Sequence, residues 1–285
     1  MYTYKYEYDK IEMGRNMSDT FLKWAGGKRW FVKTECDRLP TDFGTYYEPF
    51  LGGGSVFFYL QPERAVLSDI NQELINTYIS VRDDINSVYR NLRIHQNNHS
   101  KEYYYKIRER KTRASATAAA RMIYLNKACF NGIYRVNKKG EFNVPFGTEN
   151  RDVNFVREKL IRTSRILRTS EILCQDFQVT IDMAGQNDFI FCDPPYAVEN
   201  GDGRFVAYTA DLFSWNDQVR LAATLARAKD RGAKIIMTNV GHPSLIDLYN
   251  QYNGFLIEQT ERKCMIAADT TVRRNYNELI ITANL

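Results

Sequence analysis

The four residues Asp193-Pro194-Pro195-Tyr196 carry groups that could hold a planar ring bearing an amine. They follow the apolar run 189–192 (Phe-Ile-Phe-Cys), which predicts a buried strand that ends where the prolines remove backbone donors. In open α/β sheets, ligands bind outside the carboxyl ends of such strands. Asp193 and the Pro194 carbonyl could each accept a hydrogen from the amine, while Tyr196 stacks on the ring. The alternative is an ordinary Pro-Pro turn in which Asp193 acts only as a cap.

A second candidate ligand site lies in the segment 46–55, which reads Tyr-Tyr-Glu-Pro-Phe-Leu-Gly-Gly-Gly-Ser. We interpret it as a strand, a glycine turn and a helix start whose backbone N–H groups face a ligand. Because the pattern is not GxGxxG, it argues against a dinucleotide. The next predicted strand, 65–69, ends at Asp69, which is placed to accept hydrogen bonds from ribose hydroxyls. The alternative is that Asp69 caps the helix predicted to begin near Asn71.

Two further segments have groups suited to a nucleoside. Residues 21–28 (Phe-Leu-Lys-Trp-Ala-Gly-Gly-Lys) combine an indole and two lysines with glycines that let backbone approach a ligand closely. The short strand predicted at 172–177 ends in Asp176 and Phe177, an acid and a ring for the amino group and face of an adenine. We also predict a helix at 216–231, a buried strand at 234–239 and an antiparallel edge formed by 256–258 and 278–282. The connection 201–213 is interpreted as a flexible lid.

The positive charge of the chain is concentrated in its middle. The net charge is +5, yet residues 101–168 contain seventeen Lys or Arg against six Asp or Glu, so the remainder is net negative. This part interrupts the strand–helix alternation with helices over 86–127 and a hairpin-like loop over 130–147 that presents Arg135 and Lys138. Cations interleaved with aromatic residues favour nucleic acid as a partner. The alternative is a solvated helical insertion that binds nothing.

Composition narrows the class of protein. The chain has 285 residues, of which 44% are hydrophobic and 26% charged, as in ordinary globular proteins. No apolar run is long enough to cross a membrane, and residues 1–20 are interpreted as a loose, Tyr-rich arm and not as a signal peptide. Five scattered cysteines and three histidines form no metal-binding pattern, so we expect no metal and a reduced, cytoplasmic protein.

Taken in order, these segments resemble the Dam-type (alpha-class) DNA adenine-N6 methyltransferases, which use S-adenosylmethionine. The resemblance runs from about Phe21 to the C-terminus and rests on FLKWAGGK, YYEPFLGGGSVFF, SDINQELI, FNGIYRVNKKGEFNVPFG, QDF and FCDPPY. It implies a Rossmann-like, seven-stranded α/β sheet with a mostly helical target-recognition insertion that carries a β-hairpin. We expect the arm at 1–20, the catalytic domain at 21–80 and 163–285, and the DNA-binding insertion at 81–162.

The resemblance also implies site residues. The reacting adenine would be flipped out of double-stranded DNA and held by Asp193, Pro194, Pro195 and Tyr196. The cofactor would be bound by Trp24, Ala25, Gly26, Lys28, Phe50, Gly52, Ser55, Asp69, Asp176, Phe177 and Asp193. DNA would face Lys23, Phe130, Asn131, Ile133, Arg135, Asn137, Lys138, Pro145 and Thr148. Phe130 would wedge into the duplex, and Arg135 would read a guanine.

The sequence departs from the GATC-specific members at one position. In those proteins an Arg follows the PFG or PYG motif, whereas Thr148 follows Gly147 here. A threonine hydroxyl cannot reproduce a bidentate contact with guanine, so the target is GATC or another short site. An NAD(P)-dependent oxidoreductase, a methyltransferase for RNA or a protein amide, and a non-catalytic DNA-binding module remain alternatives. We expect a monomer, with a cognate restriction or defence component as an open question.

Overall fold

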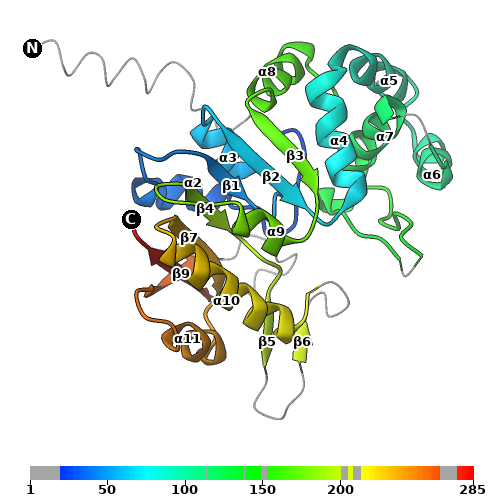
Figure 1. Ribbon diagram of the computed structural model, residues 1–285. Coiled ribbons are helices and arrows are strands. Elements are labelled where there is room, and N and C mark those ends of the chain that lie inside the picture. The colour runs from blue at the N-terminus through cyan, green and yellow to red at the C-terminus, as the bar shows by residue number, and fades with distance from the viewer. Residues whose placement is uncertain are drawn as a thin grey trace, which may run out of the picture. The chain divides into compact units, whose positions relative to one another are not determined.

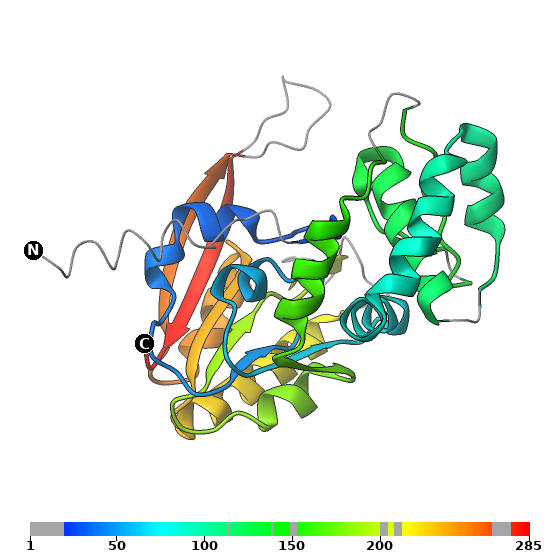
Figure 2. The ribbon, with the colours of Figure 1, turned by 90° about the horizontal axis from the view of Figure 1, so that it is seen from above.

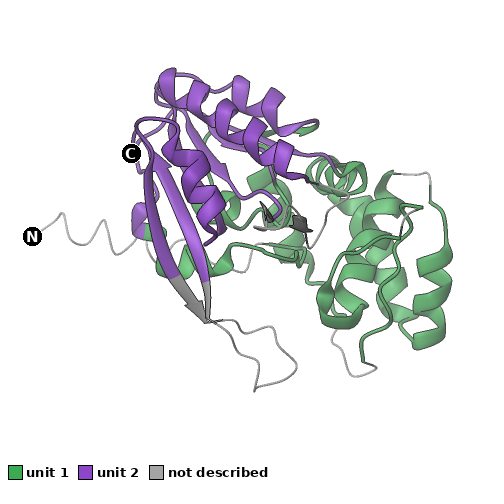
Figure 3. Ribbon diagram, turned by 90° about the horizontal axis from the view of Figure 1, so that it is seen from below, with its two compact units in different colours: residues 1–36, 51–63, 71–174 green, residues 37–50, 64–70, 175–285 purple. Residues whose placement is uncertain are grey.

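The computed structural model describes residues 20–112, 115–137, 139–148, 153–199, 205–207, 213–263 and 275–285. The chain divides into two compact units, which Figure 3 shows in two colours. Unit 1 consists of residues 1–36, 51–63 and 71–174, and unit 2 of residues 37–50, 64–70 and 175–285. Residues 1–19 of the predicted N-terminal arm lie outside the described residues.

The strands form the seven-stranded mixed sheet that was predicted. Their order is β3-β2-β1-β4-β7-β9-β8, and Figure 1 labels most of them. β1 pairs in parallel with β2 and β4, and β4 pairs in parallel with β7. β9 runs antiparallel between β7 and β8, which confirms the predicted antiparallel edge. The strand bounds are Tyr46–Glu48 (β1), Ala65–Asp69 (β2), Ser170–Cys174 (β3), Phe189–Cys192 (β4), Lys234–Val240 (β7), Leu256–Lys263 (β8) and Asn275–Ala283 (β9).

Unit 2 packs helices against this sheet. The all-apolar strand β4 is buried at every residue, as are the central residues of β7. Such continuous apolar runs are typical of parallel strands covered on both faces. α9 (Phe177–Asp182) packs against β1 and β2, and α10 (Trp215–Asp230) packs against α9, β7 and α11 (Pro243–Asn250), as Figure 1 shows. α10 begins at a capping box in which Ser214 and Asp217 satisfy each other's backbone donors, so its start is fixed locally.

Unit 1 is mostly helical. α4 packs against α5, α7 and α8, and α7 packs against α5 and α6, so their apolar faces form one buried core. These are the cyan and green helices of Figure 2. This confirms helices, with no strand among the described residues, between residues 86 and 127. The bounds are Arg29–Thr34 (α2), Ser55–Leu60 (α3), Gln72–Asp83 (α4), Ile85–Asn97 (α5), Lys101–Glu109 (α6), Ser115–Ala128 (α7) and Arg157–Leu167 (α8), with 3-10 turns Cys36–Arg38 (η1) and Phe130–Gly132 (η2).

The loop after α7 is hairpin-like, but it does not form a continuous ladder. Two isolated antiparallel bridges join Cys129 to Phe146 and Val136 to Phe142. A further backbone bond from Asn143 N to Arg135 O, 3.1 Å long, lies between them. The loop therefore has a defined path without the long strands of a regular β-hairpin.

Part of the connection predicted as a flexible lid is a short strand. Two short strands, β5 (Ala197–Glu199) and β6 (Phe205–Ala207), pair antiparallel in this region. Most of the remaining residues of the predicted connection 201–213 lie outside the described residues. The sequence of this connection is rich in glycine and polar residues, so the alternation of apolar and polar residues did not predict the short strand pair.

Candidate active site

Asp193 lies directly after β4, where its carboxylate is held by a neighbouring strand. Thr238 Oγ1 on β7 donates a hydrogen bond to Asp193 Oδ1 at 2.9 Å. The parallel register pairs Cys192 with Met237, so Asp193 and Thr238 are the next residues along the two strands. Thr238 is completely buried. One oxygen of the carboxylate is thus fixed by the sheet, which orients the other.

The rest of the motif is also held in place within unit 2. The Tyr196 hydroxyl donates to Glu278 Oε2 on β9 at 3.3 Å, and Glu278 is buried. Gln218 Nε2 on α10 approaches the Pro195 carbonyl at 3.5 Å, and Pro194 is buried. Asp193 and Tyr196 are half-buried. These contacts exceed those of a plain Pro-Pro turn, because three separate elements hold the four residues.

The motif lies at the point where the strand order reverses. Strands β1, β2 and β3 lie to one side of β4, and β7 lies to the other. In doubly wound sheets, ligands bind in the crevice outside the carboxyl ends of the strands at such a switch point. Phe50 follows the carboxyl end of β1 and Asp193 follows that of β4, and the two strands pair in parallel. The topology therefore favours a ligand beside both residues.

A cluster of aromatic rings lies near this edge of unit 2. Phe50 stacks on Phe177 with ring centroids 5.3 Å apart and planes 26° apart, and Phe213 meets both rings. The guanidinium of Arg220 lies 4.1 Å from the centroid of Phe177. Two residues predicted to bind opposite ends of one ligand are thus in direct contact in this structure.

Asp176 is engaged in an ion pair as well as a cap. Its carboxylate accepts from Arg220 at 2.6 and 2.9 Å and from the backbone N–H of Gln178 at 2.9 Å, at the start of α9. The hydrogen bonds from Arg220 hold the pKa of Asp176 below its usual value. The residue is therefore an anion with a fixed orientation, which suits an acceptor for a ligand N–H or O–H.

The structure separates the two interpretations of Asp69. The N-cap of α4 is Asn71, whose Oδ1 accepts from the backbone N–H of Leu74 at 3.0 Å. Asp69 is the last residue of β2 and half-buried. Since another residue caps the helix, the position of Asp69 at the carboxyl end of β2 agrees with the ribose interpretation.

In unit 1, the glycine turn lies against Trp24. A Cβ added to Gly52, which has φ +45°, would come within 2.7 Å of Trp24 Cδ1, so only glycine fits this close approach. The carbonyl of Gly52 accepts from the buried Tyr78 hydroxyl at 3.0 Å. The structure thus brings together two of the predicted cofactor residues of unit 1 and fixes the turn that carries them.

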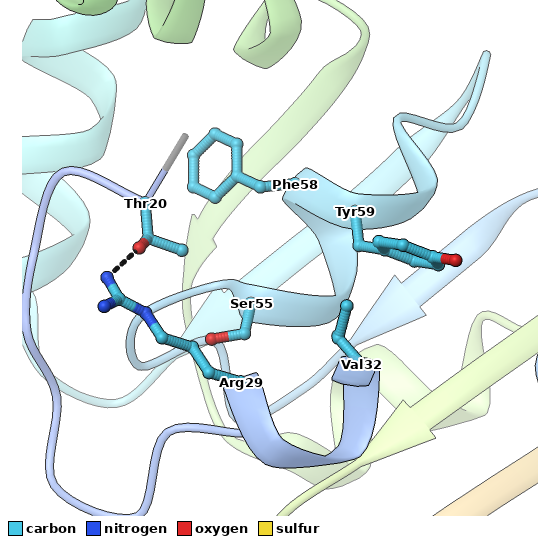
Figure 4. A pocket seen from close by; sticks show the side chains of 6 residues that line it. All are labelled: Thr20, Arg29, Val32, Ser55, Phe58 and Tyr59. Carbon is cyan, nitrogen blue, oxygen red and sulfur yellow. Dashed lines mark hydrogen bonds between the residues drawn. The ribbon is translucent and has the colours of Figure 1, made fainter. Parts of the chain in front are cut away.

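Lys28 and Ser55, both predicted to bind the cofactor, make local contacts within unit 1. Lys28 is buried, and its Nζ donates to Gly26 O at 3.0 Å, so it stabilises the turn at residues 25–27. Ser55 lines a small pocket on α2 and α3 together with Thr20, Arg29, Val32, Phe58 and Tyr59, shown in Figure 4. Arg29 donates to Thr20 across this pocket. Both contacts are local, and we assign no ligand to the pocket itself.

The residues predicted to face DNA are mostly accessible. Phe130 is 50% exposed, and Arg135, Pro145 and Thr148 are exposed as well. Arg135 Nε donates to Asn143 Oδ1 at 2.8 Å, which orients the guanidinium. Asn131, Lys23 and Ile133 are exposed or half-buried.

Asn137 has a structural task. Its Oδ1 accepts from the backbone N–H groups of Lys139 and Glu141 at 2.9 and 3.0 Å, so it shapes the tip of the loop. Its Nδ2 donates to Glu141 Oε2 at 3.1 Å. Lys138, the remaining predicted contact, lies outside the described residues.

Several residues around the site were missed in the sequence. Thr238, Glu278 and Arg220 each hold a predicted residue from a distant part of the chain. Only Thr238 had a usable signal, because two buried parallel strands with aligned ends place it beside Asp193. Glu48 is a further missed acid: it is buried at the end of β1 and accepts from Tyr46 Oη at 2.9 Å.

The described residues contain neither a metal-binding cluster nor a membrane-spanning helix. No group of three or more His, Cys, Asp or Glu among them could hold a metal ion. No helix in the same ranges is long and apolar enough to cross a membrane.

Comparisons with known proteins agree with these features. A family model described as D12 class N6 adenine-specific DNA methyltransferase matches residues 24–266. The chain is 34% identical over 270 residues to the Type II methyltransferase M1.LlaDCHI of Lactococcus lactis subsp. cremoris, covering 92% of this chain and 94% of that protein. It is 35% identical over 284 residues to the Type II methyltransferase M.MjaIII of Methanocaldococcus jannaschii (92% and 97%). It is 34% identical over 268 residues to the DNA adenine methylase of Haemophilus influenzae (91% and 92%).

Proposed function

Because the chain belongs to the D12 class N6 adenine-specific DNA methyltransferases, we propose that it transfers a methyl group from S-adenosylmethionine to N6 of a flipped adenine in double-stranded DNA. The observation that carries this proposal is the anchored carboxylate of Asp193 at the switch point of the sheet. The family supports the reaction type and DNA as the substrate. The methyl donor, the flipped state and the site residues are our proposals.

We propose that Asp193 and the Pro194 carbonyl clamp the amine of the base. Adenine N6 is a poor nucleophile because its lone pair is delocalised into the ring. Hydrogen bonds from its two N–H groups to preorganised acceptors draw electron density onto nitrogen and orient it for transfer. We propose that the hydrogen bond from Thr238 to Asp193 Oδ1 orients the carboxylate for this contact with the amine. Proton loss follows methylation.

We propose S-adenosylmethionine as the donor, whose sulfonium supplies an electrophilic methyl group when it is bound. In unit 2, the rings of Phe50 and Phe177 suit the adenine, and Asp69 and Asp176 suit hydroxyl and amino donors. In unit 1, we propose that the glycine turn, Ser55 and the segment containing Trp24, Ala25, Gly26 and Lys28 bind the methionine end.

No covalent step on the protein is needed. The thiol closest in sequence to the clamp is Cys192, and burial, with a smaller effect of Asp193, raises its pKa well above the usual value. A protonated, buried thiol is a poor nucleophile. The site therefore supports direct transfer between donor and amine.

The base must leave the duplex to reach the clamp, at a cost of a few kcal/mol. We propose that stacking on Tyr196 and insertion of Phe130 into the duplex offset this cost. The half-exposed ring of Phe130 supports the second role, because an apolar ring at the surface gains from burial between bases.

The proposal is tested with purified protein, tritiated S-adenosylmethionine and plasmid DNA from a strain without adenine methylation. Single-molecule sequencing of the product then reports the modified base and its sequence context. We expect N6-methyladenine at one short site, and none in a parallel reaction with RNA. Transfer to RNA or to protein alone, or DNA without modified adenine, would refute the proposed function.

Replacing Thr238 by Val is expected to lower kcat by about ten-fold, because a hydrogen bond to a charged group is lost while shape is retained. Thr238→Ser keeps the hydroxyl and should retain most of the activity. Steady-state kinetics and the melting temperature are measured for both. Thr224→Val on α10 is the matched control, since Thr224 is equally buried and its Oγ1 donates to Arg220 O within its own helix. Equal kinetic losses in Thr238→Val and Thr224→Val would contradict a role for Thr238 in orienting Asp193.

Replacing Arg135 by Ala is expected to relax discrimination at one base pair of the target, because a bidentate Arg–guanine contact is worth about 1–3 kcal/mol. Lys138→Ala should instead weaken binding to all DNA sequences about equally and reduce the salt dependence of binding, as loss of a phosphate contact does. Methylation of duplexes with single base-pair changes separates the two effects. The division of roles fails if both variants give the same profile.

We propose no single target sequence. The exposed Thr148 stands where GATC-specific members carry an arginine, so GATC and related short sites are both candidates for the sequencing experiment. A monomer acting beside a cognate restriction or defence component is our working proposal for its assembly, and gel filtration with multi-angle light scattering tests the first part.

A further inference from the structure

A single buried carboxamide joins two segments of unit 1 that are 103 residues apart. Asn126, near the end of α7, accepts from the backbone N–H of Lys23 at 2.9 Å and donates to the carbonyl of Lys23 at 2.8 Å. The same Nδ2 donates to Gly132 O at 3.3 Å. Asn126 is 2% exposed, so these bonds are shielded from water. Its side chain thus pairs with the Lys23 backbone as a neighbouring strand would.

We call residues 20–28 the donor segment and residues 129–147 the recognition loop. The two approach closely at Gly132, which has φ +66°. A Cβ at this position would lie 2.5 Å from Lys23 Cδ and 3.2 Å from Lys23 Cβ. Only glycine permits this combination of backbone conformation and contact. The junction is therefore a close-packed one.

A second link between the donor segment and the recognition loop runs through Tyr134. The Trp24 indole stacks on the Tyr134 ring, with centroids 4.8 Å apart and planes 19° apart. The Tyr134 hydroxyl donates to Glu73 Oε2 at 2.8 Å, and burial together with Glu73 raises the pKa of Tyr134, so the hydroxyl stays a donor. Trp24 also lies against Gly52, where an added Cβ would come within 2.7 Å of Trp24 Cδ1.

The far end of this link is fixed by α7. Arg121 Nη1 donates to Glu73 Oε1 at 3.1 Å, and its Nε and Nη2 donate to the carbonyls of Ile107 and Arg108 at the end of α6. The hydrogen bonds from Tyr134 and Arg121 each reach an acceptor on a different element. The orientation of Tyr134, and hence of Trp24, is set by the helical core of unit 1.

We propose that Asn126 and Tyr134 are positioning residues that fix the donor segment and the recognition loop onto each other, so that donor binding and target discrimination depend on the same junction. Neither side chain needs to touch donor or DNA. The inference rests on the proposed function, because it takes Trp24 as a donor contact and the loop with Phe130 and Arg135 as a DNA contact. It adds a coupling between the two that the site residues alone do not imply.

A consequence of this junction is that one substitution in it should affect the binding of both the methyl donor and DNA. Trp24 stacks on Tyr134, and Arg135 is the next residue in the sequence. If the junction loosens, both residues therefore lose their fixed positions together. The binding of each ligand then includes the entropy cost of ordering its own half of the junction, and one bound ligand no longer raises the affinity for the other. Coupling between ligands is reciprocal, so it can be measured from either side.

The test uses Tyr134→Phe and Asn126→Asp in the full chain. Tyr134→Phe keeps the ring on Trp24 but removes the bond to Glu73, and Asn126→Asp replaces a donor by an acceptor opposite two carbonyls. The first readout is the Kd of S-adenosylhomocysteine by calorimetry, with and without unmethylated plasmid DNA. The second is the ratio of methylation at the preferred site to sites that differ by one base pair, from sequencing of partly methylated plasmid.

We expect both variants to raise the Kd of S-adenosylhomocysteine by about five-fold or more and to reduce the tightening of this Kd by DNA. We also expect both to lower the ratio of methylation at the preferred site to methylation at sites that differ by one base pair. Tyr103→Phe is the matched control: it removes a tyrosine hydroxyl bond of 2.9 Å to His95 in the same unit. Asn91→Asp, which alters a carboxamide bonded to Ser87 O within α5, is the control for Asn126→Asp. Both controls should leave the two readouts at wild-type values.

A change in only one readout, or in neither, would overturn the coupling, as would equal changes in the controls. Melting temperatures show whether Asn126→Asp remains folded, and Tyr134→Phe decides the question if it does not. Failure of the proposed function is distinguishable, since the wild-type protein would then methylate no adenine at all.

Discussion

Replacing Asp193 by alanine is expected to abolish detectable methyl transfer while duplex binding stays within a few-fold of wild type. The carboxylate is one of two acceptors for the amine, and it acts on charge that develops only as nitrogen attacks the methyl group. Removing one preorganised group of this kind costs about 10²–10³ in kcat in other enzymes. DNA affinity comes mainly from phosphate contacts elsewhere, so it should not follow the loss of activity.

Asp193→Asn sharpens this expectation. The amide keeps an oxygen that can accept from Thr238 Oγ1, but it presents an NH2 group where the base amine needs an acceptor. Single-turnover kinetics and a gel-shift titration are measured for both variants. Turnover near the wild-type value in Asp193→Ala would remove the clamp mechanism, and loss of DNA binding in proportion to activity would show that Asp193 acts through folding.

The order of the main elements could be predicted because local patterns determine it. The apolar run 189–192 and the strand 65–69 were placed correctly, since an uninterrupted apolar segment with polar neighbours is typical of a buried strand. The helix predicted at 216–231 differs by one residue at each end from α10. The antiparallel edge followed from two late apolar segments with no helix expected between them.

Other features could not be predicted because they depend on contacts between distant residues. The loop 130–147 has alternating apolar residues, but its described residues form only isolated bridges, and it begins with the 3-10 turn Phe130–Gly132 instead of extended strand. The choice between ribose contact and helix cap at Asp69 needed the side-chain position of Asn71, whose Oδ1 supplies the cap. Partners such as Glu278, 82 residues beyond Tyr196, have no local signature.

The candidate site likewise combines features that local sequence patterns predict with features that depend on distant contacts. The sequence contains the residue types that bind a nucleoside and an amine, because those types follow strand ends and glycine turns. It does not contain the orientation of their side chains. Arg220 and Thr238 fix two of the predicted acids, and both are ordinary residues of a helix and a strand when read alone. Motifs therefore indicate which groups react, and long-range hydrogen bonds decide how those groups are presented.

Replacing Tyr196 by alanine is expected to lower kcat/KM by about five- to 150-fold, since stacking of a base on an aromatic ring is worth about 1–3 kcal/mol. Tyr196→Phe should remain within a few-fold of wild type. It keeps the ring and loses the 3.3 Å bond from the hydroxyl to Glu278 Oε2. The contrast separates stacking on the extruded base from anchoring of the ring in unit 2.

The measurement pairs kinetics with the fluorescence of a duplex that carries 2-aminopurine at the target adenine. An unstacked 2-aminopurine is bright, and stacking on Tyr196 quenches it, so Tyr196→Ala should give a brighter complex than wild type or Tyr196→Phe. Tyr47→Phe is the matched control, because the Tyr47 hydroxyl also makes a 3.3 Å bond, to Met183 O, in the same unit. If Tyr196→Phe lost as much activity as Tyr196→Ala, the hydroxyl and not the ring would be the essential part. The stacking role would then be wrong, while the clamp at Asp193 would stand on its own test.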